Sequence, residues 1–374
     1  MKIVVNTRLL IKDKLEGIGR FTYETLKRIT QEHPEDHFIF LFDRNFDEEF
    51  IFSDNITPLI ITPQARHPFL FYVWFEFSVK QLLRDLKPDL FLSPDGYLSL
   101  SSDVPSIAVI HDLNFEHHPE DLGYLNRSYY KRYFPKFAHK AGRIATVSEH
   151  SKQDIVNTYK INPDKIDVVY NGAGESFRPV KEEEKKEIKK QFSNGENYFL
   201  FVGALHPRKN IARLLQAYDE FKRSTGSKTK LMVVGEKYRW TNEMREAHSK
   251  MTNGTDVIFL GHIPSEQLSK IMASALALVY IPYFEGFGIP IVEAMQCEIP
   301  VITSNVTSMP EIAGDAALLV DPFSIDSIKN AMLLIEKDDS IRTSLIQKGN
   351  KRVKDFSWEK TAGLLWKSVE RTIT

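Results

Sequence analysis

The sequence predicts an α/β protein built from two doubly wound domains, each with a parallel sheet covered by helices on both faces. The chain has 374 residues, more than one hydrophobic core usually supports. Short apolar runs bounded by polar turns alternate with segments of helical periodicity, as in β-α-β units. This alternation is interrupted near Gly172 and then resumes. We therefore expect an N-terminal domain over residues 1–172 and a C-terminal domain over residues 173–355.

In the first series, the apolar runs are expected to form buried strands because they are short and rich in branched and aromatic residues. Residues 19–29 and 73–86 have the spacing of helices. The expected strands cover residues 3–6, 38–42, 90–93, 106–111 and 143–148.

The second series repeats the pattern after a charged run at 181–187, which is typical of a solvated helix face. Residues 356–374 carry apolar side chains at helical spacing and predict a final amphipathic helix. The expected strands cover residues 198–202, 230–234, 257–260, 277–281 and 300–303.

The bulk composition is that of a globular protein with almost balanced charge. The 49 basic and 50 acidic side chains create no overall field for nucleic acid, so no nucleic-acid partner is expected. A single cysteine, Cys297, allows no intrachain disulfide and fits a reducing compartment. The apolar run at 273–282 is too short to span a bilayer, and residues 1–6 predict a strand rather than a signal peptide. We expect a cytoplasmic protein.

The stretch 285–294 places two carboxylates around a glycine-rich turn. Gly286 and Gly288 can bring backbone N–H groups close to an anion, and a helix that begins near Ile289 adds its positive end. Glu293 would lie one turn into that helix, where it can accept hydrogen bonds from ribose hydroxyls, while Glu285 faces the other end of the ligand. An ordinary helix start with a capping glutamate is the alternative. The pattern favours a sugar-phosphate site.

A second motif follows the strand expected at 198–202. Gly203 ends the strand, and Arg208 and Lys209 open the next helix. Two adjacent cations at the carboxyl end of a parallel strand suit a diphosphate, because Arg208 can chelate oxygens and Lys209 adds a mobile point charge. Solvated cations at a helix start are the alternative, although they would oppose the helix dipole.

Weaker signals follow three other strands. Ser265 and Glu266 could accept a guanine N–H pair or simply start a helix. Gly17 and Gly19 open a helix in a loop that could approach phosphate. His111 ends the strand at 106–111, where a histidine is more often structural. No metal-ligand spacing, phosphate-binding Walker loop or esterase nucleophile motif is present in the sequence.

The stretches 285–294 and 203–210 resemble the signature of retaining nucleotide-sugar glycosyltransferases of family 4, which have the GT-B fold. Further matches extend from Gly17 to Glu311 and cover nearly the whole chain. The resemblance implies two Rossmann-like domains facing across a cleft. The N-terminal domain would bind the acceptor, the C-terminal domain the nucleotide sugar, and the helix at 356–374 would pack back on the N-terminal domain.

The resemblance also implies a role for each matching residue. Arg208 and Lys209 occupy diphosphate-binding positions, Ile263 contacts the nucleobase through its main chain, and His111 lies near the transferred sugar. The implied catalytic residues are His111, Glu285, Arg208 and Lys209. The implied donor-binding residues are Gly17, Gly19, Gly203, Ile263, Ser265, Glu266, Gly286, Phe287, Gly288, Ile289 and Glu293.

The implied reaction is a front-face transfer with retention, in which the leaving diphosphate helps to deprotonate the acceptor hydroxyl. The two cations neutralise the diphosphate, so neither a metal nor another cofactor is expected. The loops at 17–20, 206–210 and 111–113 look most like members that add mannose or a related hexose to a saccharide or lipid-linked saccharide of bacterial surface polysaccharides such as lipopolysaccharide. GDP-mannose is the first donor expected. UDP-glucose or UDP-N-acetylglucosamine, a sugar-nucleotide 2-epimerase and a non-catalytic sugar-nucleotide binding protein are the alternatives.

Aromatic residues crowd the stretch 69–77, with Arg66, Lys80, Arg84 and Lys87 nearby. A buried helix is the favoured interpretation, because runs of this kind usually pack in a core. The alternative is a peripheral contact with the inner face of the cytoplasmic membrane.

Overall fold

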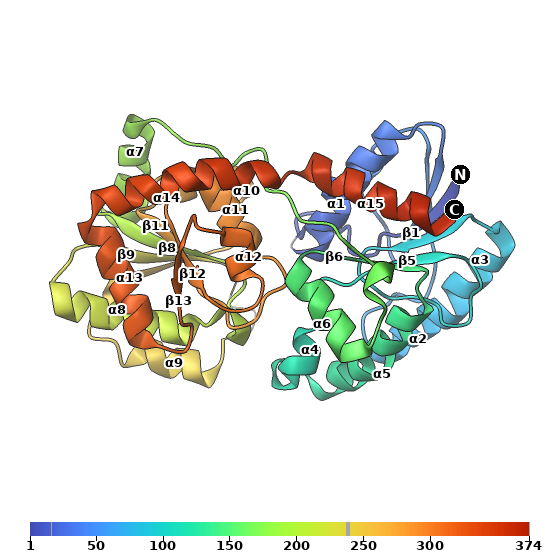
Figure 1. Cartoon of the computed structure of the whole chain (residues 1–374), viewed down its shortest axis with the longest axis horizontal. Helices are drawn as coiled ribbons and strands as arrows, with labels where there is room; N and C mark the ends of the chain where they lie inside the picture. Colours follow the sequence, from blue (N-terminus) through green and yellow to red (C-terminus); the bar gives the residue numbers. More distant parts are fainter. Residues whose placement is uncertain (16, 237–239, 374) are drawn as a thin grey trace. The chain divides into compact units, whose positions relative to one another are not determined.

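Two parallel sheets organise the chain, as a computed structural model of residues 1–15, 17–236 and 240–373 shows (Figure 1). Unit 1 comprises Met1–Asn171 together with Ser357–Thr374, and unit 2 comprises Gly172–Phe356. These limits fall one residue from the domain boundaries expected from the sequence. The α/β class with two doubly wound sheets is confirmed.

The sheet of unit 1 has seven parallel strands in the order β3-β2-β1-β4-β5-β6-β7. The sequence analysis missed β3 and β7, the two edge strands. β3 contains Pro58 and is only partly buried, and β7 has three residues, so neither carries a continuous apolar run. The strands are β1 (Lys2–Asn6), β2 (His37–Phe42), β3 (Ile56–Ile60), β4 (Leu90–Ser93), β5 (Ser106–Val109), β6 (Arg143–Thr146) and β7 (Ile166–Val168).

Helices connect and cover these strands. The helix expected at 73–86 begins earlier, at Pro68, and its middle third is π-helical. The α-helices of unit 1 are α1 (Ile18–Glu32), α2 (Pro68–Val73), α3 (Lys80–Leu86), α4 (Asn114–His117), α5 (Tyr124–Lys140), α6 (Glu149–Tyr159) and α15 (Trp358–Ile373). The π-helix is η2 (Trp74–Val79), and the short 3-10 helices are η1 (Glu48–Phe50), η3 (Pro119–Asp121) and η4 (Pro163–Lys165).

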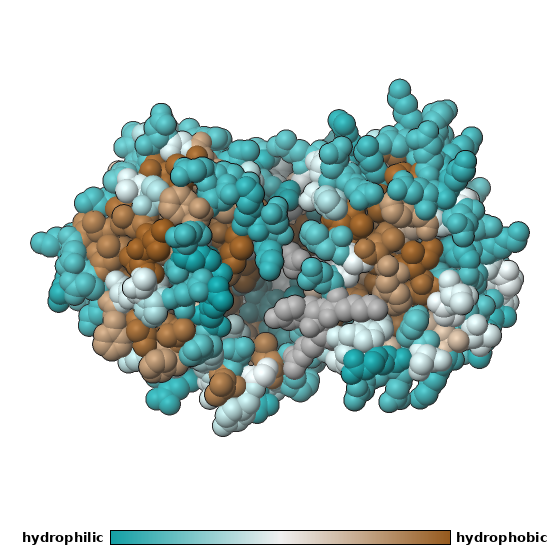
Figure 2. Space-filling view, turned by 180° about the vertical axis from the view of Figure 1, so that it is seen from behind, coloured by the Kyte–Doolittle hydropathy of each residue, from teal (hydrophilic) through white to brown (hydrophobic). Residues whose placement is uncertain are grey.

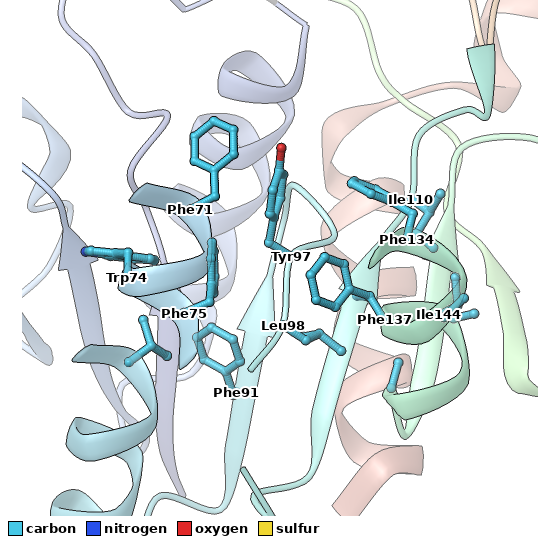
Figure 3. Close-up of a cluster of buried hydrophobic side chains, with 14 of the residues drawn as sticks. Phe71, Trp74, Phe75, Phe91, Tyr97, Leu98, Ile110, Phe134, Phe137 and Ile144 are labelled. Atoms are coloured by element: carbon cyan, nitrogen blue, oxygen red, sulfur yellow. The ribbon is translucent and has the colours of Figure 1, made fainter. Parts of the chain in front are cut away.

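An aromatic core lies between the unit 1 sheet and the helices α2 to α5 (Figure 3). Trp74 and Phe75 are fully buried, and the ring of Phe75 stacks on Tyr97 with centroids 5.4 Å apart. Tyr97 also meets Phe134 edge to face at 5.3 Å. Burying a large aromatic side chain stabilises a fold by about 2 to 3 kcal/mol, so this cluster fixes the helices on the sheet.

The sheet of unit 2 has six parallel strands in the order β10-β9-β8-β11-β12-β13. Its central strand β8 is buried along its whole length, as its uninterrupted apolar sequence predicts. The sequence analysis missed only β13, which is the edge strand and has three residues. The strands are β8 (Tyr198–Val202), β9 (Lys230–Val234), β10 (Val257–Gly261), β11 (Ala277–Tyr280), β12 (Val301–Ser304) and β13 (Leu318–Val320).

The charged run at 181–187 opens α7, whose outer face is exposed as expected. The α-helices of unit 2 are α7 (Glu182–Ser193), α8 (Ile211–Thr225), α9 (Asn242–Ser249), α10 (Ser265–Ala273), α11 (Ile289–Gln296), α12 (Met309–Ala313), α13 (Ile325–Lys337) and α14 (Asp339–Arg352). The short 3-10 helices are η5 (Pro207–Lys209), η6 (Gly254–Asp256) and η7 (Val353–Asp355).

The last helix, α15, belongs to unit 1 and lies along α1 (Figure 1). Trp358 and Leu365 are buried there. The Thr361 hydroxyl donates to the Tyr170 carbonyl at 2.6 Å, and Arg28 of α1 pairs with Glu359 at 2.8 Å. Unit 1 therefore needs residues from both ends of the described chain.

The face seen in Figure 2 is mostly hydrophilic and is interrupted by hydrophobic patches. Across the described parts of the chain, every helix is either too short or too polar to cross a bilayer.

Candidate active site

The order of strands in unit 2 reverses between β8 and its neighbour β11. In open α/β sheets, ligands bind beyond the carboxyl ends of the strands at such a reversal. Gly203, Arg208 and Lys209 follow β8, and Glu285 follows β11. The Tyr283 N–H donates to the Arg208 carbonyl at 3.0 Å, which joins the two loops. The fold thus brings together residues that lie about 80 positions apart in the chain.

The three charged side chains in these loops form one cluster. An oxygen of Glu285, Oε2, accepts from Arg208 Nη1 at 2.6 Å and also pairs with Lys209 Nζ. Arg208 is a quarter exposed, whereas Lys209 and Glu285 are nearly buried. Two cations that share one carboxylate leave an excess positive charge at the end of the sheet, as a binding place for a polyanion requires.

Tyr280, the last residue of β11, belongs to the same cluster and was missed by the sequence analysis. Its hydroxyl donates to Glu285 Oε2 at 2.9 Å and also contacts Lys209 Nζ, which lies 4.9 Å from the centre of the Tyr280 ring. The side chain is fully buried. The sequence does show a tyrosine hydroxyl at the carboxyl end of an apolar strand. Its contacts with Lys209 and Glu285 cannot be read from the sequence, because they depend on the pairing of β8 with β11.

Electrostatics keep Glu285 ionised. Burial by itself raises the pKa of this carboxyl group, but Arg208 and Lys209 outweigh that effect and lower the pKa to about 2. Glu285 is therefore a fixed negative charge that can accept hydrogen bonds at any physiological pH.

The glycine-rich turn leads into α11 as the sequence predicts. Gly288 has φ of 93°, a left-handed backbone conformation that favours glycine, and a Cβ atom there would also displace the terminal methyl group of Met309. The Ser308 hydroxyl donates to the Glu285 carbonyl at 2.9 Å and holds the start of the turn. α11 begins at Ile289, and Glu293 lies half-buried one turn into it.

The remaining turn residues fall between these points: Gly286 is buried, and Phe287 is buried with its ring edge to face against Phe356 at 5.6 Å.

The loop after β10 lies at the carboxyl ends of the strands, as the loop after β8 does, and one strand, β9, separates β10 from β8. Hydrogen bonds between strand ends connect the three loops: Gly203 N–H donates to the Val234 carbonyl at 2.9 Å, and Gly235 N–H donates to the Gly261 carbonyl at 2.8 Å. Ile263 is half-buried in this loop. Ser265 and Glu266 are exposed at the start of α10, and Ser265 does not cap the helix, because the N-cap is Pro264.

In unit 1 the strand order reverses between β1 and β4, and His111 follows the next strand, β5. Its Nε2 lies 2.9 Å from the Pro94 carbonyl oxygen, which can only accept, so Nε2 carries the proton and Nδ1 a lone pair. The ring meets Phe21 edge to face at 5.0 Å. Burial lowers the pKa of His111, and the imidazole is neutral at pH 7.

The sequence analysis missed a buried ion pair, Arg8 with Asp95, at the strand reversal of unit 1. Arg8, two residues beyond β1, donates to Asp95 at 2.7 Å, and its guanidinium lies 4.6 Å from the centre of the Tyr97 ring. Asn6 donates to the same carboxylate at 2.8 Å. Asp95 lies two residues beyond β4, so this network occupies the strand reversal of unit 1.

The glycine loop of unit 1 opens α1 as expected. Gly17 is the N-cap residue with φ of 48°, and a Cβ atom on Gly19 would lie 2.9 Å from the Leu9 carbonyl oxygen. Arg20 pairs with Glu24 one turn later at 2.8 Å. The glycines allow the close approach of backbone that the sequence indicates, while Arg20 points its charge at its own helix.

Among the described residues, His33, Glu35 and Asp36 are close enough together to offer three ligand atoms to a metal, within 4.8 Å of one another. Their side chains already have partners. Asp36 pairs with the amino group of Met1, and the His33 ring stacks on Trp366 at 3.7 Å. We assign no metal to this cluster.

Comparisons with known proteins agree with the fold and place the chain in a family. The model of the glycosyl transferases group 1 matches residues 182–352, and that of glycosyltransferase family 4 matches residues 15–175. A solved structure of Anabaena Alr3699/HepE in complex with UDP-glucose has a TM-score of 0.77 at 16% identity and covers 99% of this chain and 100% of that one.

Two curated relatives are O-antigen chain mannosyltransferases. Mannosyltransferase B of Escherichia coli is 30% identical over 96% of this chain and 97% of its own length. RfbU of Salmonella typhimurium is 28% identical over 61% of this chain and 60% of its own length. Matches that span both units, together with the GT-B arrangement of two Rossmann-like sheets, establish that the chain is a glycosyltransferase of family 4.

Proposed function

We propose that this glycosyltransferase moves a hexose, with GDP-mannose as the first donor, to a saccharide or lipid-linked saccharide acceptor in the synthesis of a surface polysaccharide. The cluster of Arg208, Lys209 and Glu285 at the strand reversal of unit 2 carries the proposal for the donor. The choice of mannose is supported by the two relatives, which are named as O-antigen mannosyltransferases.

The donor diphosphate would lie between the cations and the N-terminus of α11. Arg208 can present two N–H groups to phosphate oxygens, and Lys209 is held beside it by Tyr280. The backbone N–H groups of Gly286 to Ile289 would add the positive end of the helix dipole. Glu293 would accept hydrogen bonds from the ribose, and the loop of Ile263, Ser265 and Glu266 would border the base.

Negative charge grows on the diphosphate as the bond to the sugar breaks. Arg208 and Lys209 would stabilise that charge in place of a divalent cation, so the transfer is expected to proceed without metal. Glu285, ionised because of its low pKa, would hold sugar hydroxyls rather than attack the anomeric carbon. Retention would then follow from attack by the acceptor on the same face that the diphosphate leaves, with a diphosphate oxygen taking the acceptor proton.

His111 would bind a hydroxyl of the transferred sugar through its neutral imidazole. Its Nε2–H is committed to Pro94, so Nδ1 can accept a hydrogen bond from a hydroxyl. The glycines Gly17 and Gly19 would let the start of α1 approach the donor from unit 1.

Calorimetry would test the donor. GDP, UDP, GDP-mannose and UDP-glucose are titrated into the protein in the presence of EDTA, and then into Lys209→Ala. We expect the guanine series to bind and the variant to bind it at least ~10-fold more weakly, the size of one lost charge-assisted contact. Binding of the uracil series alone would replace GDP-mannose by a UDP-sugar, and binding only after Mg²⁺ is added would contradict metal independence.

Product analysis would test the reaction. With GDP-mannose and a mannose-containing oligosaccharide acceptor, the anomeric proton and carbon couplings of the product should show the α configuration of the donor. A product of inverted configuration would exclude the front-face route, and epimerised free nucleotide sugar without an acceptor product would favour the 2-epimerase alternative.

A further inference from the structure

The aromatic stretch at 69–77 is only half buried. Phe71, Trp74 and Phe75 point into the core of unit 1 (Figure 3), as the buried-helix interpretation predicts. Phe69 and Phe77, however, are 67% and 61% exposed. A single exposed phenylalanine is ordinary, as Phe323 of unit 2 shows, so what matters is whether these rings belong to a larger apolar patch.

A neighbouring helix extends this exposed aromatic face. Tyr72 is 39% exposed, and its ring lies 6.1 Å from Phe77 and 6.0 Å from Tyr133 of α5. Figure 1 draws α2 and α5 side by side, in agreement with the contact between Phe71 and Tyr129 at 5.7 Å. Rings from two elements thus form a continuous surface rather than isolated exposed residues.

Cations surround the same rings. Lys136 Nζ lies 5.5 Å from the centre of the Tyr133 ring, and the Arg132 guanidinium lies 5.9 Å from it. Both side chains are exposed, and neither forms an ion pair within the part of the chain that the structure describes. We call Phe69, Tyr72, Phe77, Arg132, Tyr133 and Lys136 the aromatic–basic surface.

The charge around this surface is strongly one-sided in a protein that is nearly neutral. Residues 64–84 and 124–140 together contain eight Lys or Arg side chains and one acidic side chain, Glu76, against 49 and 50 in the whole chain. Three of these cations, Arg84, Lys131 and Lys140, lie 3.9 to 4.0 Å from carboxylates outside the two ranges, whereas Arg132 and Lys136 do not take part in such pairs among the described residues. The Glu76 carboxylate accepts from the backbone N–H of Leu100 at 2.5 Å and from the hydroxyl of Ser101 at 2.6 Å. Its charge is therefore engaged with the adjacent loop.

We propose that the aromatic–basic surface docks unit 1 on a bilayer that carries anionic lipids. Exposed aromatic rings enter the headgroup region, where an amphipathic ring is favoured, and Lys and Arg beside them attract anionic headgroups. Charge complementarity selects this occupant: an apolar partner protein would account for the phenylalanines but not for a helix, α5, with five Lys or Arg side chains and no acidic one. The proposal depends on no step of the transfer reaction.

Vesicle flotation with the purified full chain tests the proposal. The wild-type protein is mixed with vesicles of phosphatidylcholine containing ~30% phosphatidylglycerol and with vesicles of phosphatidylcholine alone. We expect the protein to float with the anionic vesicles, to stay at the bottom with neutral ones, and to be released by high salt, which screens the attraction.

Two double variants separate the contributions of charge and aromatic rings. Arg132→Glu with Lys136→Glu should weaken binding at least ~30-fold, since each cation near an anionic bilayer contributes roughly a factor of five. Phe69→Ser with Phe77→Ser should also lose flotation. Matched controls in unit 2 are Lys186→Glu with Lys190→Glu on α7 and Phe323→Ser, all exposed, and they should float like the wild type.

All replaced side chains are exposed, so thermal unfolding of every variant should match the wild type, and transfer to a water-soluble acceptor should continue. The proposal is wrong if the wild-type protein stays at the bottom with anionic vesicles. It is equally wrong if the variants of the aromatic–basic surface float as well as the controls, or if neutral vesicles bind the protein as tightly as anionic ones.

Discussion

Both units have a parallel sheet with a reversal of strand order, but the side chains beyond the carboxyl ends of the strands carry different charges in the two units. In unit 2, the loops at the reversal of strand order place Arg208 and Lys209 against the single carboxylate of Glu285. In unit 1, the corresponding edge pairs Arg8 with Asp95 one to one and adds a neutral His111. Topology therefore creates an equivalent reversal of strand order in each unit, and side-chain charge distinguishes the two.

An excess of positive charge suits a nucleoside diphosphate, whereas an edge without excess positive charge but with hydrogen-bonding groups suits neutral sugar hydroxyls. The contrast predicts that the side-chain cations that neutralise the diphosphate come from unit 2. Four substitutions test this contrast between the two units, and they are given from the largest expected effect to the smallest.

The largest effect is expected at Lys209. Lys209→Ala removes one of the two cations that stabilise the leaving diphosphate, so turnover should fall about 10²-fold or more. Initial rates at saturating donor measure the loss, and Lys186→Ala on α7 is the control for removing an exposed lysine from unit 2. Rates close to wild type in Lys209→Ala would remove this lysine from the reaction.

Glu285→Gln should separate donor binding from transfer. Without the carboxylate that shares both cations, GDP should bind as tightly as before or more tightly, while transfer falls about 10- to 100-fold because a charged acceptor of sugar hydroxyls is lost. Calorimetry with GDP and rate measurements form the paired readout. Loss of GDP binding would mean that Glu285 organises the phosphate site rather than the sugar site.

Tyr280→Phe should produce a smaller change. It deletes one buried hydroxyl that contacts Lys209 and Glu285, a loss of about 1 kcal/mol, or roughly fivefold in kcat. The affinity for GDP should change less than kcat, since both cations remain. An unchanged kcat would show that Lys209 and Glu285 hold their positions without the tyrosine.

The smallest effect concerns pH and unit 1. The pKa of His111 is lowered in the folded state, so below the unfolded value of about 6.5 the unfolded chain binds more protons and stability decreases as the pH falls. His111→Asn should therefore gain stability relative to wild type between about pH 7 and about pH 5, by up to about 1 kcal/mol.

Thermal unfolding at several pH values measures the difference between the two proteins. Asn in place of His262, an exposed histidine of unit 2, is the control. A His111→Asn difference that does not vary with pH would contradict the neutral state of this half-buried imidazole.

Much of this organisation could be predicted from residues alone. Strands buried on both faces, such as β8 and β9, were predicted with their observed bounds because their apolar runs have no interruption. The edge strands β3, β7 and β13 were missed because an edge is less buried and its sequence carries less apolar signal. Lys209 and Glu285 were each assigned to the site from their own motif, and the structure adds that the pairing of β8 with β11 brings the two side chains into contact.

The residues that sequence analysis missed are those whose contacts depend on which strands are neighbours in the sheet. Tyr280 gains its role only because β11 lies beside β8, and Asp95 gains its role only because β4 lies beside β1. No local pattern in either loop encodes the neighbour. The aromatic stretch is a third case, since Phe69 and Phe71 have the same residue type and only the helix orientation separates exposure from burial.

The position of α15 has a consequence for how the protein is made and how it can be divided. A nascent chain carries α1 before unit 2 and α15 after it, so the surface of α1 where Phe21 meets Trp358 stays uncovered until unit 2 has been synthesised. A domain exchange with a relative must therefore transfer two segments, residues 1–171 and 357–374, together. A single crossover near Gly172 would join α1 to a foreign final helix and separate Arg28 from Glu359.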